Sequence, residues 1–242
     1  MVKLSLAYFD TLLILSQAFA FTFVVCAGFF YNSLGWGFQW GEAGITNSGN
    51  MNLHGTFMSI GMVFLQGEAI LSYRLYRHDA KLLSKFVHVA LHCLAIAFAG
   101  CGLYCIIEHK NLHGFKHFYS FHSWLGIALL AAYLVQFTFG LLNYGLGVMP
   151  LSIRASFLPL HRVLGLLIFG VTGAQALLGS ITYVDIASKT VEFSCYNSFS
   201  CSSHLDAIFN TGMVCLVLYA VTVGVLVTPA VWRRQKTPDE EN

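Results

Sequence analysis

Four histidines stand near the ends of long apolar segments, where a metal-binding side chain would be surrounded by lipid. They are His54, His88, His122 and His161. An ionisable group inside a membrane-spanning segment is energetically costly, so such residues usually mark a functional site. Two of the four lie near one face of the apolar region and two lie near the other. The pattern predicts two buried metal centres, one above the other across a bilayer.

The composition places these histidines in a membrane protein. The chain has 242 residues, of which 57% are hydrophobic and only 10% are charged. Apolar runs of about 20 residues are long enough to cross a bilayer as helices, and they are too long for barrel strands. We predict an all-α polytopic membrane protein, formed as one domain over residues 1–242. The six predicted transmembrane helices are 8–30, 53–73, 86–107, 121–143, 158–181 and 205–232.

Basic residues in the short loops predict the orientation of the chain, because cytosolic loops carry an excess of Lys and Arg. One side carries Lys3, Arg74, Arg77, Lys81, Lys85, Arg154, Arg162, Arg233, Arg234 and Lys236, and the other carries Lys110, Lys116 and Lys189. Both termini, including a short tail over 233–242, are therefore predicted to be cytosolic.

The first twenty residues have some features of a signal peptide, but Asp10 interrupts the apolar stretch and the hydrophobic run continues to Phe30. We therefore predict that this segment is retained as the first membrane span.

The depths of the four histidines pair His54 with His122 on the non-cytosolic side and His88 with His161 on the cytosolic side. Two neutral imidazoles from opposed helices suit a low-spin haem iron that transfers electrons. A zinc site would need four ligands, and no further Cys or carboxylate lies at matching depth. The C-x-x-C-H signature of covalent haem is missing, which favours haem b. Two haem b groups per chain are predicted, about 20 Å apart.

His92 lies one helical turn beyond His88, on nearly the same face. It could replace His88 as a ligand or contact a haem edge, and we favour the second role because His88 matches the depth of His161. A single membrane histidine is more often a hydrogen-bonded packing residue. Four histidines at paired depths favour the metal-ligand interpretation.

Several motifs resemble those of the cytochrome b-561 family. They are Asn52-Leu53-His54, Phe64-Leu65-Gln66-Gly67 with Tyr73-Arg74, the stretch from Lys81 to His92, Tyr119-Ser120-Phe121-His122-Ser123-Trp124, and Pro159-Leu160-His161. The resemblance covers roughly residues 8–232. It implies six helices, the central four of which hold two b haems on the four histidines, often in a homodimer. It also implies electron transfer from cytosolic ascorbate to monodehydroascorbate or a ferric iron chelate.

Ascorbate is an anion at neutral pH, so its site needs cations beside the inner haem. Lys85 precedes His88 by three residues on the same helix face, and Lys81 continues that stripe. Arg74 and Arg154 match family positions associated with ascorbate. The alternative is that these cations are ordinary topology residues, which is how we interpret Arg77 and Arg162.

On the opposite side, Tyr119 matches a family position near the acceptor site. Glu108, His109, His113 and His117 surround it in sequence and could hold ferric iron transiently. The family usually has a histidine in this loop, but Lys110 occupies the ungapped position and His109 is one residue away. The histidines favour iron slightly, and a hydrated loop without a site is the alternative.

Glu68 lies fourteen residues after His54, close to four helical turns along the same face. It is therefore predicted to point at the level of the inner haem, where it would pair with a cation or accept the proton lost by ascorbate.

Cys195 and Cys201 share the last non-cytosolic loop, where an oxidising compartment would favour a disulfide between them. The spacing alone leaves that bridge open.

Two other functional classes fit parts of the sequence. A transporter or channel could use the histidines to relay protons or bind cations, but it would need helices broken near the midplane. The four prolines, Pro150, Pro159, Pro229 and Pro238, fall at predicted span ends or in loops, and no internal repeat is obvious. A subunit that only scaffolds haem is the other alternative. The sequence fits a plasma membrane, a secretory vesicle or an endolysosomal membrane, and it indicates no nucleic-acid partner.

Overall fold

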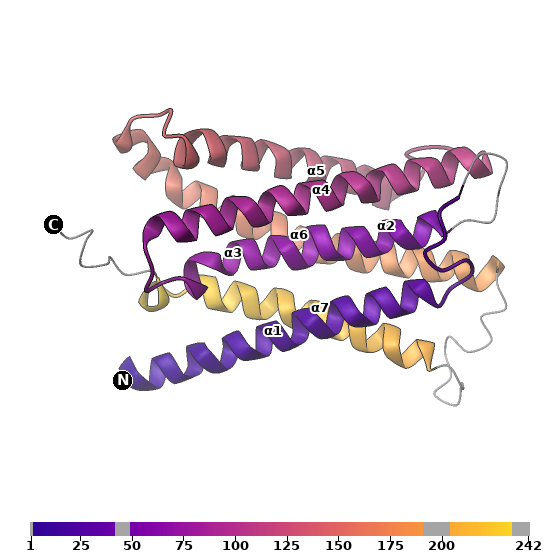
Figure 1. Ribbon diagram of the computed structural model, residues 1–242, viewed down its shortest axis with the longest axis horizontal. Coiled ribbons are helices and arrows are strands. Elements are labelled where there is room, and N and C mark those ends of the chain that lie inside the picture. The colour runs from indigo at the N-terminus through magenta and orange to yellow at the C-terminus, as the bar shows by residue number, and fades with distance from the viewer. Residues whose placement is uncertain (1, 42–48, 191–203, 234–242) are drawn as a thin grey trace.

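The computed structural model describes residues 2–41, 49–190 and 204–233, and these residues form helices without a strand (Figure 1). In chain order the elements are α1 (Val2–Asn32), α2 (Asn50–Met58), η1 (Ser59–Leu65), α3 (Gln66–Leu75), α4 (Lys81–His113), α5 (Phe121–Gly140), η2 (Leu141–Gly145), α6 (Leu151–Thr190), α7 (Leu205–Val227) and η3 (Ala230–Trp232). The predicted all-α class is confirmed.

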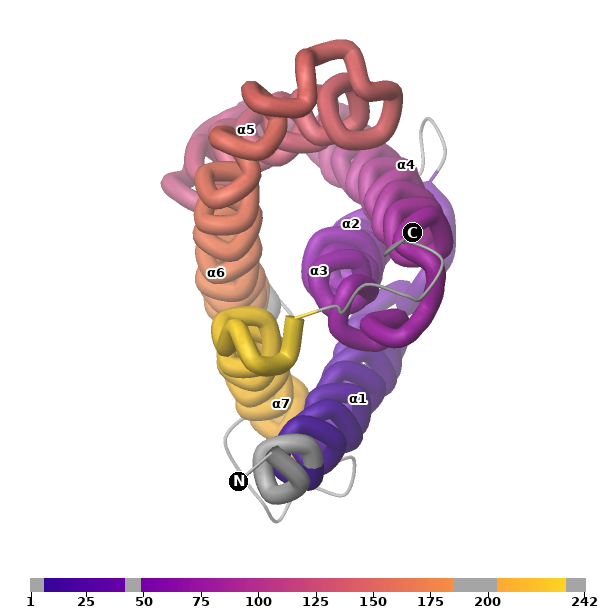
Figure 2. The backbone as a smooth tube through the Cα atoms, turned by 90° about the vertical axis from the view of Figure 1, so that its left-hand side faces the viewer, coloured from indigo at the N-terminus to yellow at the C-terminus, as the bar shows by residue number. Residues whose placement is uncertain are grey.

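The helices run roughly parallel to one long axis and reverse direction at each connection. Figure 2, an end view, shows α2–α3, α4, α5 and α6 arranged around the upper part of the bundle, with α1 and α7 packed together below them. The start of α1 and the end of α7 lie at the same end (Figure 1). We call this the basic end, because the turns at residues 76–80 and 146–150 and their flanking cations lie there too.

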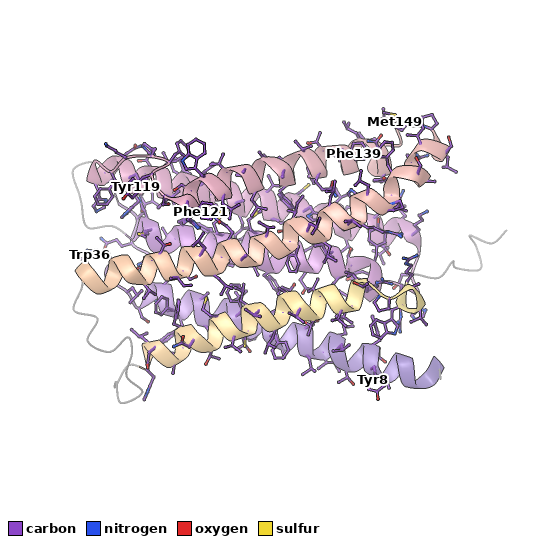
Figure 3. The ribbon with its side chains drawn as sticks, turned by 180° about the vertical axis from the view of Figure 1, so that it is seen from behind. Tyr8, Trp36, Tyr119, Phe121, Phe139 and Met149 are labelled. Carbon is purple, nitrogen blue, oxygen red and sulfur yellow. The ribbon has the colours of Figure 1, made fainter. Side chains whose placement is uncertain are left out.

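Five helices in the described part of the chain are long and apolar enough to cross a membrane. The sixth predicted span is the continuous rod α2–η1–α3, which a π-helical segment divides into shorter pieces. Large aromatic side chains stand on the outer surface toward the ends of the bundle, among them Trp36, Tyr119 and Phe121 (Figure 3). Such residues are typical of membrane–water interfaces.

Several helix boundaries differ from the sequence prediction, and two of these differences involve a proline. α6 begins at Leu151, so Pro159 lies inside this helix and not at its start. The main-chain bond from Arg154 N to Pro150 O opens the helix about two turns earlier than predicted, and the helix tolerates a proline that cannot donate to the preceding turn. α7 ends at Val227, five residues before the predicted limit, because Pro229 cannot continue it.

The π-helical segment η1 changes which residues face which neighbours. An i→i+5 turn holds one residue more than an α turn, so it shifts all later residues by about 100° around the axis. As a result Gln66 accepts a hydrogen bond from Thr172 of α6, and Gly67 lies directly against the Tyr219 hydroxyl of α7. The face of α3 after η1 is therefore set by the π turn.

We expect Gly67→Ala to destabilise the protein by about 1–3 kcal/mol, the usual cost of overpacking a core. A Cβ at Gly67 would lie 2.2 Å from the Tyr219 hydroxyl, which is too close for any real contact. Gly173→Ala is the matched control, because its nearest neighbour would be Ala220 Cβ at 3.7 Å. Thermal unfolding in detergent should show a lower midpoint for Gly67→Ala only, and equal midpoints would contradict the packing described here.

Candidate functional site

The first histidine pair lies toward the end of the bundle opposite the basic end. The rings of His54 in α2 and His122 in α5 have centroids 6.3 Å apart and planes at 90°. His54 Nδ1 lies 2.8 Å from Gly102 O, and His122 Nδ1 lies 2.9 Å from the amide nitrogen of Gln175. With both Nδ1 atoms engaged, Nε2 is the nitrogen that each ring can offer to a metal. We call these two residues the outer pair.

The second pair, His88 of α4 and His161 of α6, has the same kinds of Nδ1 contact near the basic end and is called the inner pair. His88 Nδ1 lies 2.7 Å from Ala69 O, and His161 Nδ1 lies 3.0 Å from the amide nitrogen of Gln136. The two rings interact electrostatically with each other. Metal-binding histidines usually have the second ring nitrogen fixed in this way, because the hydrogen bond sets ring orientation and tautomer.

His122 and His161 belong to an internal sequence repeat, although no repeat was predicted. Residues His122, Gly126, Gln136 and Gly140 recur as His161, Gly165, Gln175 and Gly179, each 39 residues later. α5 and α6 are antiparallel, so each glutamine reaches the histidine of the other helix. The spacing H-x3-G-x9-Q-x3-G is readable in the sequence, and it could have revealed both glutamines as site residues.

Glycines let the main chain approach the rings closely. A Cβ at Gly179 would lie 2.6 Å from His122 Cε1, and a Cβ at Gly140 would lie 2.9 Å from His161 Cε1. Within the described residues, no three His, Cys, Asp or Glu side chains gather into a group that could hold a metal ion. Two imidazoles from opposed helices instead fit a metal whose remaining positions a planar cofactor fills. The donor set therefore fits haem.

His92, the predicted haem-edge residue, lies beside the inner pair. Its ring centroid is 4.4 Å from that of His88, and its Nδ1 lies 2.6 Å from the hydroxyl of Tyr133 in α5. Tyr133 is buried between η1, α4 and α5. His92 therefore has a side-chain partner of its own, unlike His54 and His88, which contact carbonyl oxygens.

Three of the predicted cations gather at the basic end near His161. Lys85 Nζ donates to Tyr144 O at 2.9 Å, and the Tyr144 ring is 5.1 Å from the ring of His161. Lys85 also interacts electrostatically with Lys81 and Arg154. These residues come from the starts of α4 and α6, so they form one positively charged group across two helices.

Arg74 belongs to a different group. It is 6% exposed, and its Nη2 donates to the carbonyl oxygens of Val227 and Pro229, where α7 ends. Its Nη1 is buried without a hydrogen-bond partner. The positive charges of Arg233, Arg162 and Arg77 act on Arg74. The sequence did not reveal that Arg74 closes α7, because that contact joins residues far apart in the chain.

The predicted acceptor residues at the opposite end divide into two sets. His109 and His113 are adjacent, with ring centroids 4.3 Å apart, and His109 interacts electrostatically with His54. His117 and Glu108 instead each contact Asn111, and Tyr119 is 82% exposed. Lys110, which we did not select from the sequence, exerts its charge on both His54 and His122. Lys110 and His109 are therefore the members that interact electrostatically with the outer pair.

Glu68 does not point at the inner pair. Its carboxylate accepts hydrogen bonds from Gln17 Nε2 at 3.0 and 3.2 Å and from the Tyr219 hydroxyl at 2.9 Å. These partners belong to α1 and α7, and neither is a cation. Glu68 does lie at the level of the inner pair, since the neighbouring Ala69 contacts His88. The predicted direction and the pairing with a cation were wrong, because the prediction assumed α-helical phase from His54 onward, whereas η1 turns the later residues away.

The predicted bridge between Cys195 and Cys201 lies outside the described residues. Within them, Cys26, Cys93, Cys101, Cys105 and Cys215 are free thiols.

Fold and site together define an integral membrane protein whose helices present two opposed histidine pairs, as in a b-type cytochrome. The family described as eukaryotic cytochrome b561 matches residues 53–184, more than half of the chain. The chain belongs to this family. Membership implies that it binds haem b, in agreement with the donor set.

Similar proteins from three animals match this chain along most of their sequences. A transmembrane ascorbate-dependent reductase CYB561 homolog of Caenorhabditis elegans is 31% identical over 98% of this chain and 89% of its own. The transmembrane ascorbate-dependent reductase CYB561 of Ovis aries is 30% identical over 93% and 85%. The plasma membrane ascorbate-dependent reductase CYBRD1 of Xenopus tropicalis is 33% identical over 84% and 71%. The similarity thus extends through the membrane region and beyond a single motif.

We expect Arg74→Ala to lower the thermal midpoint, because it removes hydrogen bonds from a charged group to two carbonyl oxygens, each worth about 1.5–3 kcal/mol. Lys116→Ala is the control, since it removes a cation that is exposed at the other end. The two midpoints are compared in detergent by circular dichroism. An Arg74→Ala protein as stable as wild type would contradict a role in closing α7.

Proposed function

We propose that the protein carries single electrons across the membrane from ascorbate to an acceptor on the opposite side, through two haem b groups. His88 and His161 would hold the inner haem, and His54 and His122 would hold the outer haem. The observation that carries this proposal is the repeated geometry of the two pairs, each with Nδ1 engaged and Nε2 left for a metal. The names of the relatives support ascorbate as the donor.

The donor site is the positively charged group beside the inner pair. Lys81, Lys85 and Arg154 give an ascorbate anion three cations, and Tyr144 links Lys85 to the ring of His161. Arg154 Nε is buried without a hydrogen-bond partner, so this guanidinium has a donor left for an oxygen of the substrate. Arg74 also retains a buried Nη1, and it contributes positive charge from the neighbouring group.

The acceptor site lies beside the outer pair. Lys110 supplies a positive charge there, which suits an anionic acceptor, and both monodehydroascorbate and ferric citrate are anions. His109 and His113, with rings 4.3 Å apart, add imidazoles that suit iron. They favour the ferric chelate slightly over monodehydroascorbate. Tyr119, Glu108 and His117 would lie toward the outer edge of this site.

The electron balance is simple. Bound haem b supplies reversible one-electron chemistry. Ascorbate loses one electron and one proton and becomes monodehydroascorbate, and the proton passes to the aqueous side on which ascorbate binds. The acceptor gains the electron, so ferric iron becomes ferrous, or monodehydroascorbate takes up the electron together with one proton from its own aqueous side and becomes ascorbate. The role of the protein is to bind the anions, hold the four imidazoles and exclude water between the two levels.

The proposed function also requires a defined orientation of the chain in the membrane. The basic end is cytosolic under the positive-inside rule, so both termini face the cytosol and the electron leaves the cytosol. The chain works as a homodimer in a plasma, secretory or endolysosomal membrane, and the name of the Xenopus relative supports the first of these.

The decisive experiment uses vesicles that contain the protein and internal ascorbate, with ferric citrate outside. Wild-type vesicles should reduce the external iron, whereas His88→Ala and His122→Ala should each lose one haem per chain and slow the transfer at least tenfold. His78→Ala is the control, because His78 is exposed, contacts Arg77 and belongs to neither histidine pair. Full haem content and unchanged transfer in both ligand variants would contradict the assignment of the two pairs.

We expect Lys85→Gln to change the KM for ascorbate and Lys110→Gln to change the KM for ferric citrate. Each removes one charge that suits an anion, and a contact of about 1.4 kcal/mol corresponds to a tenfold change in affinity. Lys85→Gln should raise the KM for ascorbate about tenfold and leave the KM for ferric citrate alone. Lys110→Gln should do the reverse, so each variant is the control for the other. If either variant moved both constants equally, separate donor and acceptor sites would be excluded.

A further inference from the structure

Gln136 and Gln175 occupy equivalent places in the two halves of the α5–α6 pair. The amide nitrogen of Gln175 lies 2.9 Å from His122 Nδ1 and donates to His122 O at 2.6 Å. The amide nitrogen of Gln136 lies 3.0 Å from His161 Nδ1 and donates to His161 O at 2.7 Å. Each glutamine therefore holds both the ring and the main chain of one histidine on the opposite helix.

The other histidine of each pair is held differently. His54 and His88 have their Nδ1 atoms against the carbonyl oxygens of Gly102 and Ala69, which can only accept a hydrogen bond. These two rings are therefore fixed with the proton on Nδ1. A side-chain amide has both a donor and an acceptor, so Gln136 and Gln175 can serve a ring with its proton on either nitrogen.

The amide oxygen of Gln175 is buried and can still accept a hydrogen bond. The residue is 8% exposed, and its Oε1 is buried with no hydrogen-bond partner. A metal bound at Nε2 requires the ring proton on Nδ1, where it needs an acceptor. A half-turn of the amide exchanges nitrogen for oxygen and brings Oε1 to Nδ1, and the amide nitrogen then gives up its bond to His122 O.

We infer that Gln136 and Gln175 are positioning residues for the haem ligands His161 and His122, one at each level. The inference rests on the proposed haem ligation. When Nε2 binds iron, the amide oxygen accepts the Nδ1 proton, fixes the ring and raises the electron donation of the ligand. Gly126 supports this role for Gln175, because a Cβ at Gly126 would lie 2.9 Å from Gln175 Nε2 and would crowd the amide.

The test uses the purified protein with its haem and replaces each glutamine in two ways. Gln175→Met keeps the length of the side chain but removes the acceptor, so the ligand donates less and the outer haem should become easier to reduce. Gln175→Glu supplies a stronger acceptor, so the outer haem should become harder to reduce. We expect a change of about tenfold in the ratio of ferric to ferrous affinity, which is 59 mV for one electron. Gln136→Met and Gln136→Glu should do the same at the inner haem only.

The measurements are a potentiometric titration and the low-temperature electron paramagnetic resonance spectrum, with signals assigned from His88→Ala and His122→Ala. Thr172→Val is the control, because it removes a buried bond to Gln66 of α3 that touches no histidine. Opposite shifts for Met and Glu, confined to one haem, support the inference, as does loss of that haem alone. The inference would be overturned by unmoved signals from both haems in all four variants. Equal shifts at both levels, or the loss of both haems from one variant, would also overturn it. A wild-type protein without haem would instead overturn the proposed function on which the inference rests.

Discussion

A histidine ring inside a bilayer has two nitrogen atoms that need partners, and hydrocarbon offers none. In this protein each of the four candidate ligands has one of its two ring nitrogens, Nδ1, in contact with a polar atom of the facing helix. Because each contact joins two antiparallel helices, the same hydrogen bonds also set how those helices lie against each other. The packing of α2–α3 against α4 and of α5 against α6 therefore depends on this one constraint.

The π-helical segment η1 makes this arrangement possible on the α2–α3 rod. His54 faces α4 before the segment, and Ala69 O reaches His88 of α4 after it. The same turn sends Glu68 toward α1 and α7, where Gln17 and Tyr219 satisfy its carboxylate. Extra turns of this kind often occur at functional sites. In this protein η1 lets the α2–η1–α3 rod contact the histidine-bearing helix α4 on one face and the outer helices α1 and α7 on another.

Much of the fold could be predicted because its cause is local in the sequence. Six apolar runs fix the six helical segments, and the depths of His54, His88, His122 and His161 follow by counting along them. Glu68 and Pro159 show where counting fails, since a π turn and an early helix start depend on packing between helices. The role of Arg74 at the end of α7 and of Lys110 beside the outer pair also depends on contacts across the bundle. The glutamine repeat was readable in the sequence, whereas the contact of each glutamine with the histidine of the other helix depends on how α5 and α6 pack.

The measurement that tests the central claim most directly is haem content, combined with the visible spectrum of the purified wild-type protein before and after ascorbate. Two haem b groups per chain, both low-spin and largely reduced by ascorbate, are the predicted result, because each histidine pair supplies both axial ligands. One haem per chain, or a high-spin spectrum typical of a single histidine ligand, would contradict the paired assignment. A folded protein without haem would contradict the account as a whole.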